Sequence, residues 1–380
     1  MQILTVDIGT GTQDIYLFQS GLSLENGYKI VAPSPTMLIR RQIQNATRRG
    51  EALLLTGVTM GGGPCHWAAE AHLQAGYKVF ATPEAARTFN DDLEWVHREM
   101  GVEVVSEDEA VILDHVRHIK LLDFDFDAIA RSFIAFEVNL DPQAVAVAVF
   151  DHGAAPPDIS DRQFRFDYLM ERIQAENRLS TFAYLSSDVP SIMTRMQAVV
   201  KSAAGLDCPL LIMDTAPAAV LGATLDPHVA ARPRILITNV GNFHTLAFRL
   251  GPTGVEGVFE HHTGLIDPPR LDALLQALAD GSLTHQEVFD AHGHGALILH
   301  PEPLPLVGDE FGVVVTGPRR SMIRGSQFRP HFAVPYGDMM LTGCFGLLVS
   351  VAKHVQELAD PIQAALAGAG AETAPWDVES

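Results

Sequence analysis

Two short glycine-bearing segments carry the residue types that bind phosphate groups. The first reads Asp-Ile-Gly-Thr-Gly-Thr-Gln-Asp over 7–14, and the second reads Thr-Asn-Val-Gly-Asn-Phe-His-Thr over 238–245. Glycine lets a tight turn bring backbone N–H groups close to anionic oxygens, and small hydroxyl side chains add further donors. Because β-rich runs flank both segments, we expect two hairpins whose tips bind phosphate.

The predicted contacts to a nucleotide come from the two tips. They are Gly9, Thr10, Gly11 and Thr12 in the first segment, and Asn239, Gly241, Asn242, His244 and Thr245 in the second. Asp7 ends the strand before the first tip and Asp14 begins the strand after it, positions from which carboxylates could hold hydrated Mg²⁺. Any β-hairpin can carry such glycines, so an ordinary turn also explains either segment taken singly.

Strands and helices alternate around these segments. Strand patterns occupy 2–8, 14–19, 28–32, 53–57, 78–81, 102–105, 144–151, 210–214 and 312–317, and helical patterns occupy 36–50, 65–75, 83–99, 125–137, 162–177, 190–204, 215–222, 268–280, 284–291 and 339–357. This alternation predicts an α/β sheet with parallel strand pairs. After a predicted linker at 226–233, two β runs joined by a glycine turn recur, so the chain repeats its first element.

Five segments in a fixed order resemble the nucleotide-binding motifs of the superfamily of actin, sugar kinases and Hsp70, the actin-like ATPases. They are a first phosphate loop at 6–14, a first connecting segment at 212–222, a second phosphate loop at 238–245, an adenosine loop at 313–318 and a second connecting helix at 336–346. The resemblance implies an α/β fold of two ribonuclease-H-like lobes with an interlobe cleft for ATP and Mg²⁺. It places Gly317 against the nucleotide, and Arg319 and Arg320 follow within reach of base or phosphate.

The same resemblance suggests a division of the chain. The N-terminal lobe is predicted at 1–228 with an inserted α/β region at about 50–140, the C-terminal lobe at 232–338, a connecting helix at 339–360 and a loose tail at 361–380. The sequence also resembles an uncharacterised microbial family labelled pyruvate formate-lyase activating enzyme. A radical enzyme of that kind needs three clustered cysteines for its iron–sulfur cluster, whereas Cys65, Cys208 and Cys344 are widely spaced.

Two departures from the superfamily pattern weaken the case for hydrolysis relative to binding. Asn239 stands where these ATPases usually carry Asp, and the adenosine loop reads Gly-Pro instead of Gly-Gly. Asp151 ends the strand pattern at 144–151, where the superfamily often places the residue that activates water or an acceptor hydroxyl. An Asp at a strand end also caps a following loop, so both interpretations stay open.

Two further groups have open interpretations. The glycines at 61–63 open a helix, where they could bind an anion or simply reverse the chain. Histidines at 261, 262, 292 and 294, with Glu260, could assemble a transition-metal site, and other histidines occur at 66, 115, 118 and 152. Since their spacing does not place two ligands on one helix face, we favour loop or substrate contacts over metal ligation.

Composition excludes several classes of partner. The formal net charge is −20 with a pI near 5.1, and no dense Lys/Arg tract offsets it, so we expect no nucleic acid. We see no signal peptide or membrane span, and expect a cytoplasmic protein. The sequence predicts an ATP-dependent kinase or ATPase acting on a small molecule. The alternatives are a non-catalytic nucleotide-dependent partner-binding module and a His-rich metal-dependent enzyme on the same fold. Substrate and oligomeric state stay open.

Overall fold

The computed structural model describes residues 1–307 and 310–377. Its first sheet has the strand order β3-β2-β1-β8-β10-β9. These strands are β1 (Gln2–Ile8), β2 (Thr12–Gln19), β3 (Tyr28–Pro33), β8 (Ala144–Val149), β9 (Ala183–Leu185) and β10 (Leu210–Asp214). β1, β2 and β3 form an antiparallel meander, whereas β8 and β10 run parallel to β1.

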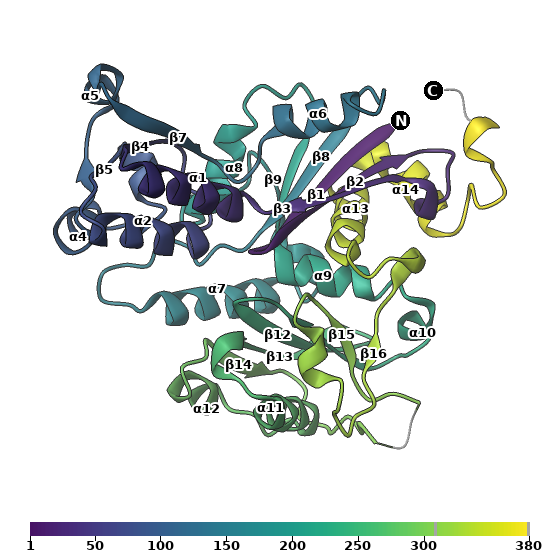
Figure 1. Ribbon diagram of the computed structural model, residues 1–380. Coiled ribbons are helices and arrows are strands. Elements are labelled where there is room, and N and C mark those ends of the chain that lie inside the picture. The colour runs from purple at the N-terminus through teal and green to yellow at the C-terminus, as the bar shows by residue number, and fades with distance from the viewer. Residues whose placement is uncertain (308–309, 378–380) are drawn as a thin grey trace.

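The second sheet repeats this plan with the order β14-β13-β12-β11-β15-β16. Its strands are β11 (Ile235–Val240), β12 (His244–Gly251), β13 (Gly254–His262), β14 (Gly295–Ile298), β15 (Val314–Thr316) and β16 (His331–Phe332). Here β11, β12 and β13 form the meander, and β15 runs parallel to β11. The first sheet lies in the upper part of Figure 1 and the second in the lower part. The duplicated strand order confirms the predicted α/β class.

A separate parallel sheet, ordered β6-β5-β4-β7, lies between β3 and β8 in the sequence. It consists of β4 (Ala52–Gly57), β5 (Val79–Ala81), β6 (Glu103–Val104) and β7 (Val116–Leu121), with α1 (Pro35–Arg49), α2 (Pro64–Gln74), α3 (Pro83–Ala86), α4 (Leu93–Trp95), the π-helical turn η2 (Val96–Met100) and α5 (Glu107–Ile112). The single helix predicted at 83–99 is wrong. Asp92 begins a new helix by accepting hydrogen bonds from the backbone of Glu94 and Trp95, which divides the segment.

The remaining helices surround the two duplicated sheets. They are α6 (Phe126–Ile134), α7 (Asp161–Ala175), α8 (Thr194–Ser202), α9 (Thr215–Ala223), α10 (Pro227–Ala230), α11 (Pro268–Asp280), α12 (His285–Asp290), α13 (Thr342–His354) and α14 (Ala359–Leu366). Short 3₁₀ turns occur at Leu24–Asn26, Leu179–Phe182, Thr263–Leu265, Arg320–Ile323, Pro335–Gly337, Gln356–Leu358 and Pro375–Asp377.

The ends of the chain differ in part from expectation. The predicted linker contains α10, capped by Asp226, and α14 occupies the start of the segment predicted as a loose tail. Ile362 of α14 is fully buried and packs in the same core as α13, which explains why this stretch is ordered. The rest of the predicted tail includes 378–380, which lie outside the described residues. The division into lobes stays a prediction.

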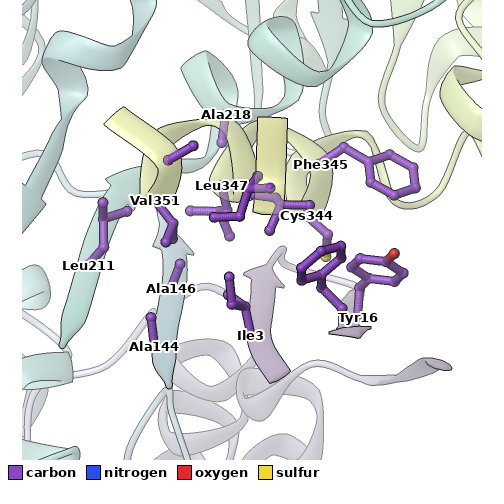
Figure 2. Close-up of a cluster of buried hydrophobic side chains, with 14 of the residues drawn as sticks. Ile3, Tyr16, Ala144, Ala146, Leu211, Ala218, Cys344, Phe345, Leu347 and Val351 are labelled. Carbon is purple, nitrogen blue, oxygen red and sulfur yellow. The ribbon is translucent and has the colours of Figure 1, made fainter. Parts of the chain in front are cut away.

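Helix α13 packs against one face of the first sheet. Figure 2 shows Leu347 and Val351 of the helix above Ile3 and Ala146 of the strands. Alanines on β8 leave room for the helix to approach the sheet, and the whole apolar stripe is buried. Among the described residues, no helix has the length and hydropathy to cross a bilayer. This packing fixes the N-terminus of α13 beside the end of β1, where the candidate site begins.

Candidate functional site

A cavity of about 340 Å³ lies between the first and second sheets. Both glycine hairpins line it, together with the ends of β8 and β15 and the start of α13. The inserted sheet contributes the segment 59–63 and the region around Arg87. Residues of both duplicated halves and of the insertion therefore line one cleft.

The two hairpins close in the same way and meet across the cavity. Gly9 N donates to Thr12 O at 3.0 Å, and Gly241 N donates to His244 O at 3.0 Å. A Cβ on Gly241 would lie 2.6 Å from His244 O, so this turn requires glycine. A Cβ on Gly11 would lie 3.1 Å from the Asn242 side-chain nitrogen. A ligand at either tip would therefore be within reach of both hairpins.

Ser34, a residue that the sequence did not single out, orients the first tip. Its Oγ donates to Thr10 O at 2.5 Å, and its backbone N–H donates to Gly11 O at 3.1 Å. In a trans peptide the C=O and the next N–H point in opposite directions. Because Ser34 holds these two carbonyls, the N–H groups of Gly11 and Thr12 point away from Ser34. Backbone donors of this kind are suited to a phosphate.

Asp7 and Asp14 form an acidic pair at the base of the first hairpin. They are direct cross-strand partners on β1 and β2. Thr215 Oγ1 donates to Asp7 Oδ1 at 2.6 Å, whereas Asp14 Oδ1 is buried without a hydrogen-bond partner among the described residues. Burial, with the charge of Asp214 adding to it, raises the pKa of Asp7 to about 6; burial and the charge of Asp7 raise the pKa of Asp14 to about 7. The donor set fits a divalent cation such as Mg²⁺.

Gly317 is required by the packing of its own backbone. Its φ is 95°, and a Cβ there would lie 2.5 Å from Val240 O and 2.6 Å from Asn239 Oδ1. This contact holds the end of β15 against the second hairpin. Arg320 lines the cavity, and its Nη1 donates to Gly317 O at 2.9 Å.

Two predicted nucleotide contacts are not supported by the geometry. The side chain of Arg319 is exposed and lies outside the cavity lining, whereas Arg320 lines the cavity. Thr245 is buried inside the second sheet, where its hydroxyl hydrogen-bonds Thr263 Oγ1 at 2.9 Å. The other predicted site residues line the cavity: Asp7, Gly9, Thr10, Gly11, Thr12, Asp14, Asp151, Asn239, Gly241, Asn242, His244 and Gly317.

Asp151 lines the cavity but is already engaged by the backbone. Its Oδ1 accepts from Gly153 N at 2.8 Å, and its Oδ2 accepts from Met196 N at 2.9 Å. Burial raises the pKa of this carboxyl, with the two backbone hydrogen bonds acting in the opposite direction. These contacts favour the loop-capping interpretation, and the role of general base stays a prediction.

An ion pair that no sequence signal indicated forms one wall of the cavity. Arg195 Nε lies 2.7 Å from Asp123 Oδ2, and its Nη2 donates to Oδ1 at 3.1 Å. Gly61 N also donates to Asp123 Oδ2 at 3.0 Å. Because this amide already has a carboxylate partner, the glycine segment is an anchored turn, which favours that alternative over an anion site.

Three imidazoles, from His152, His244 and His294, meet at the inner end of the cleft. They offer ligand atoms that all lie within 4.8 Å of one another. We call these three residues the histidine cluster. Of the histidines weighed from the sequence as a metal group, His294 belongs to it. His262 adds a ring whose centroid is 4.7 Å from that of His294. Because the three residues are far apart in the sequence, no spacing motif could have revealed the set.

Residues 60–322 match the family described as "Putative pyruvate format-lyase activating enzyme (DUF1786)". The chain belongs to this family. No protein with a curated description matches the sequence. The match begins after β4 and includes the rest of the inserted sheet, β8 to β10, the first connecting segment with α9, and the second sheet through β15; the first hairpin and α13 lie outside it.

Several solved structures are similar to this chain. An exopolyphosphatase-like protein is 12% identical with a TM-score of 0.29, covering 95% of this chain and 91% of its own. The ROK hexokinase from Thermus thermophilus is 14% identical with a TM-score of 0.21, covering 67% and 47%. The ethanolamine utilization protein EutJ from Carboxydothermus hydrogenoformans is 11% identical with a TM-score of 0.30, covering 91% and 89%. At these identities the likeness says nothing of activity or substrate.

Proposed function

We propose that the chain binds Mg²⁺-ATP in the cleft between its two duplicated sheets and acts as an ATP-dependent kinase or ATPase on a small molecule. One observation carries this proposal: two glycine hairpins of the same construction meet across a cavity beside a partly buried acidic pair. Backbone donors at the tips suit phosphate oxygens, and the carboxylates suit the cation that accompanies them.

At the first hairpin, the carboxylates would bind the cation and the backbone N–H groups would bind phosphate. Asp7 and Asp14 would hold Mg²⁺, with Thr215 orienting the first carboxylate through its hydroxyl. Bound Mg²⁺ neutralises charge on the phosphate oxygens. The N–H groups of Gly11 and Thr12 would donate to phosphate, and Arg320, which lines the cavity next to the predicted adenosine loop, would contact the base or a phosphate.

A second function, a slowly hydrolysing nucleotide-dependent module that binds a partner, has its own support. Both oxygens of Asp151 accept backbone hydrogen bonds, and Asn239 carries no charge toward a hydrated metal. Neither side chain is well placed to activate an attacking group. Binding with little turnover would follow, and the angle between the two halves would then be the output.

The iron–sulfur chemistry suggested by the family description does not fit the cysteines. Cys344 packs in the core between α13 and the first sheet, Cys208 packs against the core on the other face of that sheet, and Cys65 is buried in the core of the inserted sheet. Three thiolates in three different cores cannot ligate one cluster. We therefore derive no radical chemistry for this chain.

Thermal unfolding with and without Mg²⁺-ATP tests the proposal. A ligand at one hundred times its dissociation constant stabilises by about 2.7 kcal/mol, so Tm should rise clearly. Asp14→Asn should remove the Mg²⁺-dependent part of this rise, and Gly264→Ala, at an exposed position with no neighbour within 4 Å of a Cβ, serves as the matched control. No rise at millimolar nucleotide would contradict the proposal. ADP release in the presence of candidate acceptors then separates the kinase from the module.

A further inference from the structure

We propose that the histidine cluster, His152, His244 and His294, binds a divalent transition-metal ion of the zinc type and so ties the two halves of the chain together. This inference does not rest on nucleotide binding. It concerns a site at the inner end of the cleft, built from residues other than the acidic pair at Asp7 and Asp14.

The three imidazoles come from three separate elements. His152 follows β8 of the first sheet, where the two backbone contacts of Asp151 fix its loop. His244 begins β12 of the second sheet, and its ring stacks on Phe150 with centroids 4.1 Å apart. His294 precedes β14, and its backbone N–H donates to the backbone oxygen of Glu260 at 2.9 Å. The cluster therefore forms only when both halves are in place.

Several polar atoms in this region lack partners although they are buried. His294 is fully buried, and neither of its ring nitrogens has a hydrogen-bond partner among the described residues. The same is true of His244 Nε2 and of Glu260 Oε1. A buried polar group without a partner is costly, on the order of 1–3 kcal/mol. A cation bound by His244 Nε2 and by one ring nitrogen of His294 would satisfy two of these groups.

The buried surroundings of the cluster favour neutral imidazoles. Burial lowers the pKa of His152 to about 3, and the charges of Arg165 and His262 add to this effect. Burial also lowers the pKa of His244 and of His294 well below the usual value, with neighbouring histidines contributing. A neutral imidazole has the free lone pair that binds a metal.

The donor set selects the class of ion. Three neutral imidazoles suit Zn²⁺ or a related first-row ion and do not suit Mg²⁺ or Ca²⁺, which prefer oxygen. Zinc lies 2.0–2.1 Å from histidine nitrogen, so tetrahedral ligation requires nitrogens about 3.4 Å apart. Since the ligand atoms here lie within 4.8 Å of one another, small ring rotations would complete the site.

Glu260 lies between the buried Arg165 and the cluster residue His294. Its Oε2 lies 3.3 Å from Nε of the buried Arg165, and its Oε1 lies 3.9 Å from Nε2 of His294. A carboxylate in this position commonly orients a ligand histidine. His152 and His244 line the cavity, whereas His294 is fully buried. The open coordination position would therefore face the cavity, where a ligand with an oxygen or nitrogen donor could occupy it.

Metal analysis of the full-length protein is the test. The protein would be purified without chelator or metal-affinity steps, stripped with EDTA and titrated with Zn²⁺ and with Co²⁺. We expect one ion per chain and visible Co²⁺ absorption bands of tetrahedral intensity. His152→Ala, at a partly exposed position, and His294→Ala should each weaken Zn²⁺ binding at least tenfold.

His261→Ala is the matched control. His261 is buried beside His262 on β13, but it pairs with Thr245 and not with the cluster residue His244, so its side chain lies on the other face of the strand. This variant should bind Zn²⁺ like the unmodified chain. Melting curves without metal would verify that each variant folds. Absence of stoichiometric binding by the unmodified chain, or unchanged affinity in folded His152→Ala, would overturn the proposal.

Discussion

Gly222 of α9 and Gly346 of α13 face each other where the two connecting helices cross. A Cβ on Gly222 would lie 1.7 Å from Thr342 O, and a Cβ on Gly346 would lie 1.9 Å from Ala218 O. Each Cβ would also lie 3.0 Å from the backbone nitrogen of the other glycine. Since each added Cβ would clash with backbone atoms of the other helix, the close crossing requires glycine at both positions.

Gly346→Ala should separate these helices and destabilise the fold. Overpacking of this kind costs about 1–3 kcal/mol. Because the neighbours are rigid backbone atoms, we expect the free energy of unfolding to fall by about 3 kcal/mol. Because a Cβ on Gly343 of the same helix would lie 1.9 Å from Asp7 Oδ2, a shift of α13 would also disturb the acidic pair. Denaturant unfolding and Mg²⁺-ATP titration check both effects. Equal stability of Gly346→Ala and Gly264→Ala would contradict the close crossing.

The acidic pair predicts that Mg²⁺ binding strengthens as pH rises. The pKa values of Asp7 and Asp14 are raised from 3.8 to about 6 and about 7, so both carboxyls carry protons at pH 5 that the cation must displace. Below pH 6 the affinity should rise by up to about a hundredfold per pH unit, between 6 and 7 by about tenfold, and above 7 it should level off. Calorimetric titration of Mg²⁺ at fixed nucleotide across pH 5–8 measures this profile.

Asp14→Asn is the control for this dependence. It removes one of the two displaced protons, so binding should be weaker and the remaining pH slope should be about half as steep. Titration of the nucleotide phosphates affects both proteins equally, and the difference between them isolates the carboxyl. Parallel profiles would show that the cation displaces no proton from Asp14.

Arg165 should be essential because it neutralises two buried carboxylates. Its Nη1 lies 2.5 Å from Asp214 Oδ2 and its Nε lies 3.3 Å from Glu260 Oε2, with every side chain almost fully buried. Arg165→Met leaves these acids without a cation, at an expected cost of about 3–5 kcal/mol. Arg165→Met combined with Glu260→Gln should recover part of the loss. Denaturant unfolding of both variants measures this recovery. A double variant no more stable than Arg165→Met would be evidence against the ion pairs of Arg165 with Asp214 and Glu260.

The duplicated plan was readable from the sequence because its signals are local. Gly9 and Gly241 sit at tight turns between apolar β runs, and both turns appear where the pattern placed them. β13 escaped prediction for a physical reason. Its residues Glu256 and Glu260 are buried, which conceals the hydrophobic alternation of a strand. Ion pairs of Glu256 with Arg234 and Arg249, and of Glu260 with Arg165, make that burial tolerable.

The walls of the site could not be predicted for a related reason. Asp123 and Arg195 are 72 positions apart, and nothing near either residue indicates that they pair. The histidine cluster likewise depends on loops of both sheets meeting in space. Local motifs identified the hairpins, whereas long-range pairing determines what surrounds them.

A contact across the cleft offers a direct report on nucleotide-driven movement. Phe243, at the tip of the second hairpin, packs edge-on against Trp67 of α2, with ring centroids 5.6 Å apart. A Cβ on Gly63 would lie 2.6 Å from the same phenylalanine ring. Trp67 is 55% exposed, so its emission should respond when the hairpin moves. If Mg²⁺-ATP changes the angle between the halves, as the partner-binding module requires, the fluorescence of Trp67 should shift.

Two variants assign that signal. Trp67→Phe should abolish it, since the remaining tryptophans, Trp95 and Trp376, lie in α4 and in the final 3₁₀ turn. Phe243→Leu should reduce it and weaken the contact with Trp67 by about 0.5–1.5 kcal/mol, a roughly two- to tenfold change in nucleotide affinity. An unchanged emission spectrum with nucleotide binding verified by calorimetry would mean that the two halves hold their relative position. The partner-binding module would then have no movement to transmit to a partner. The kinase or ATPase, which acts on its bound ligand, would be the function that is left.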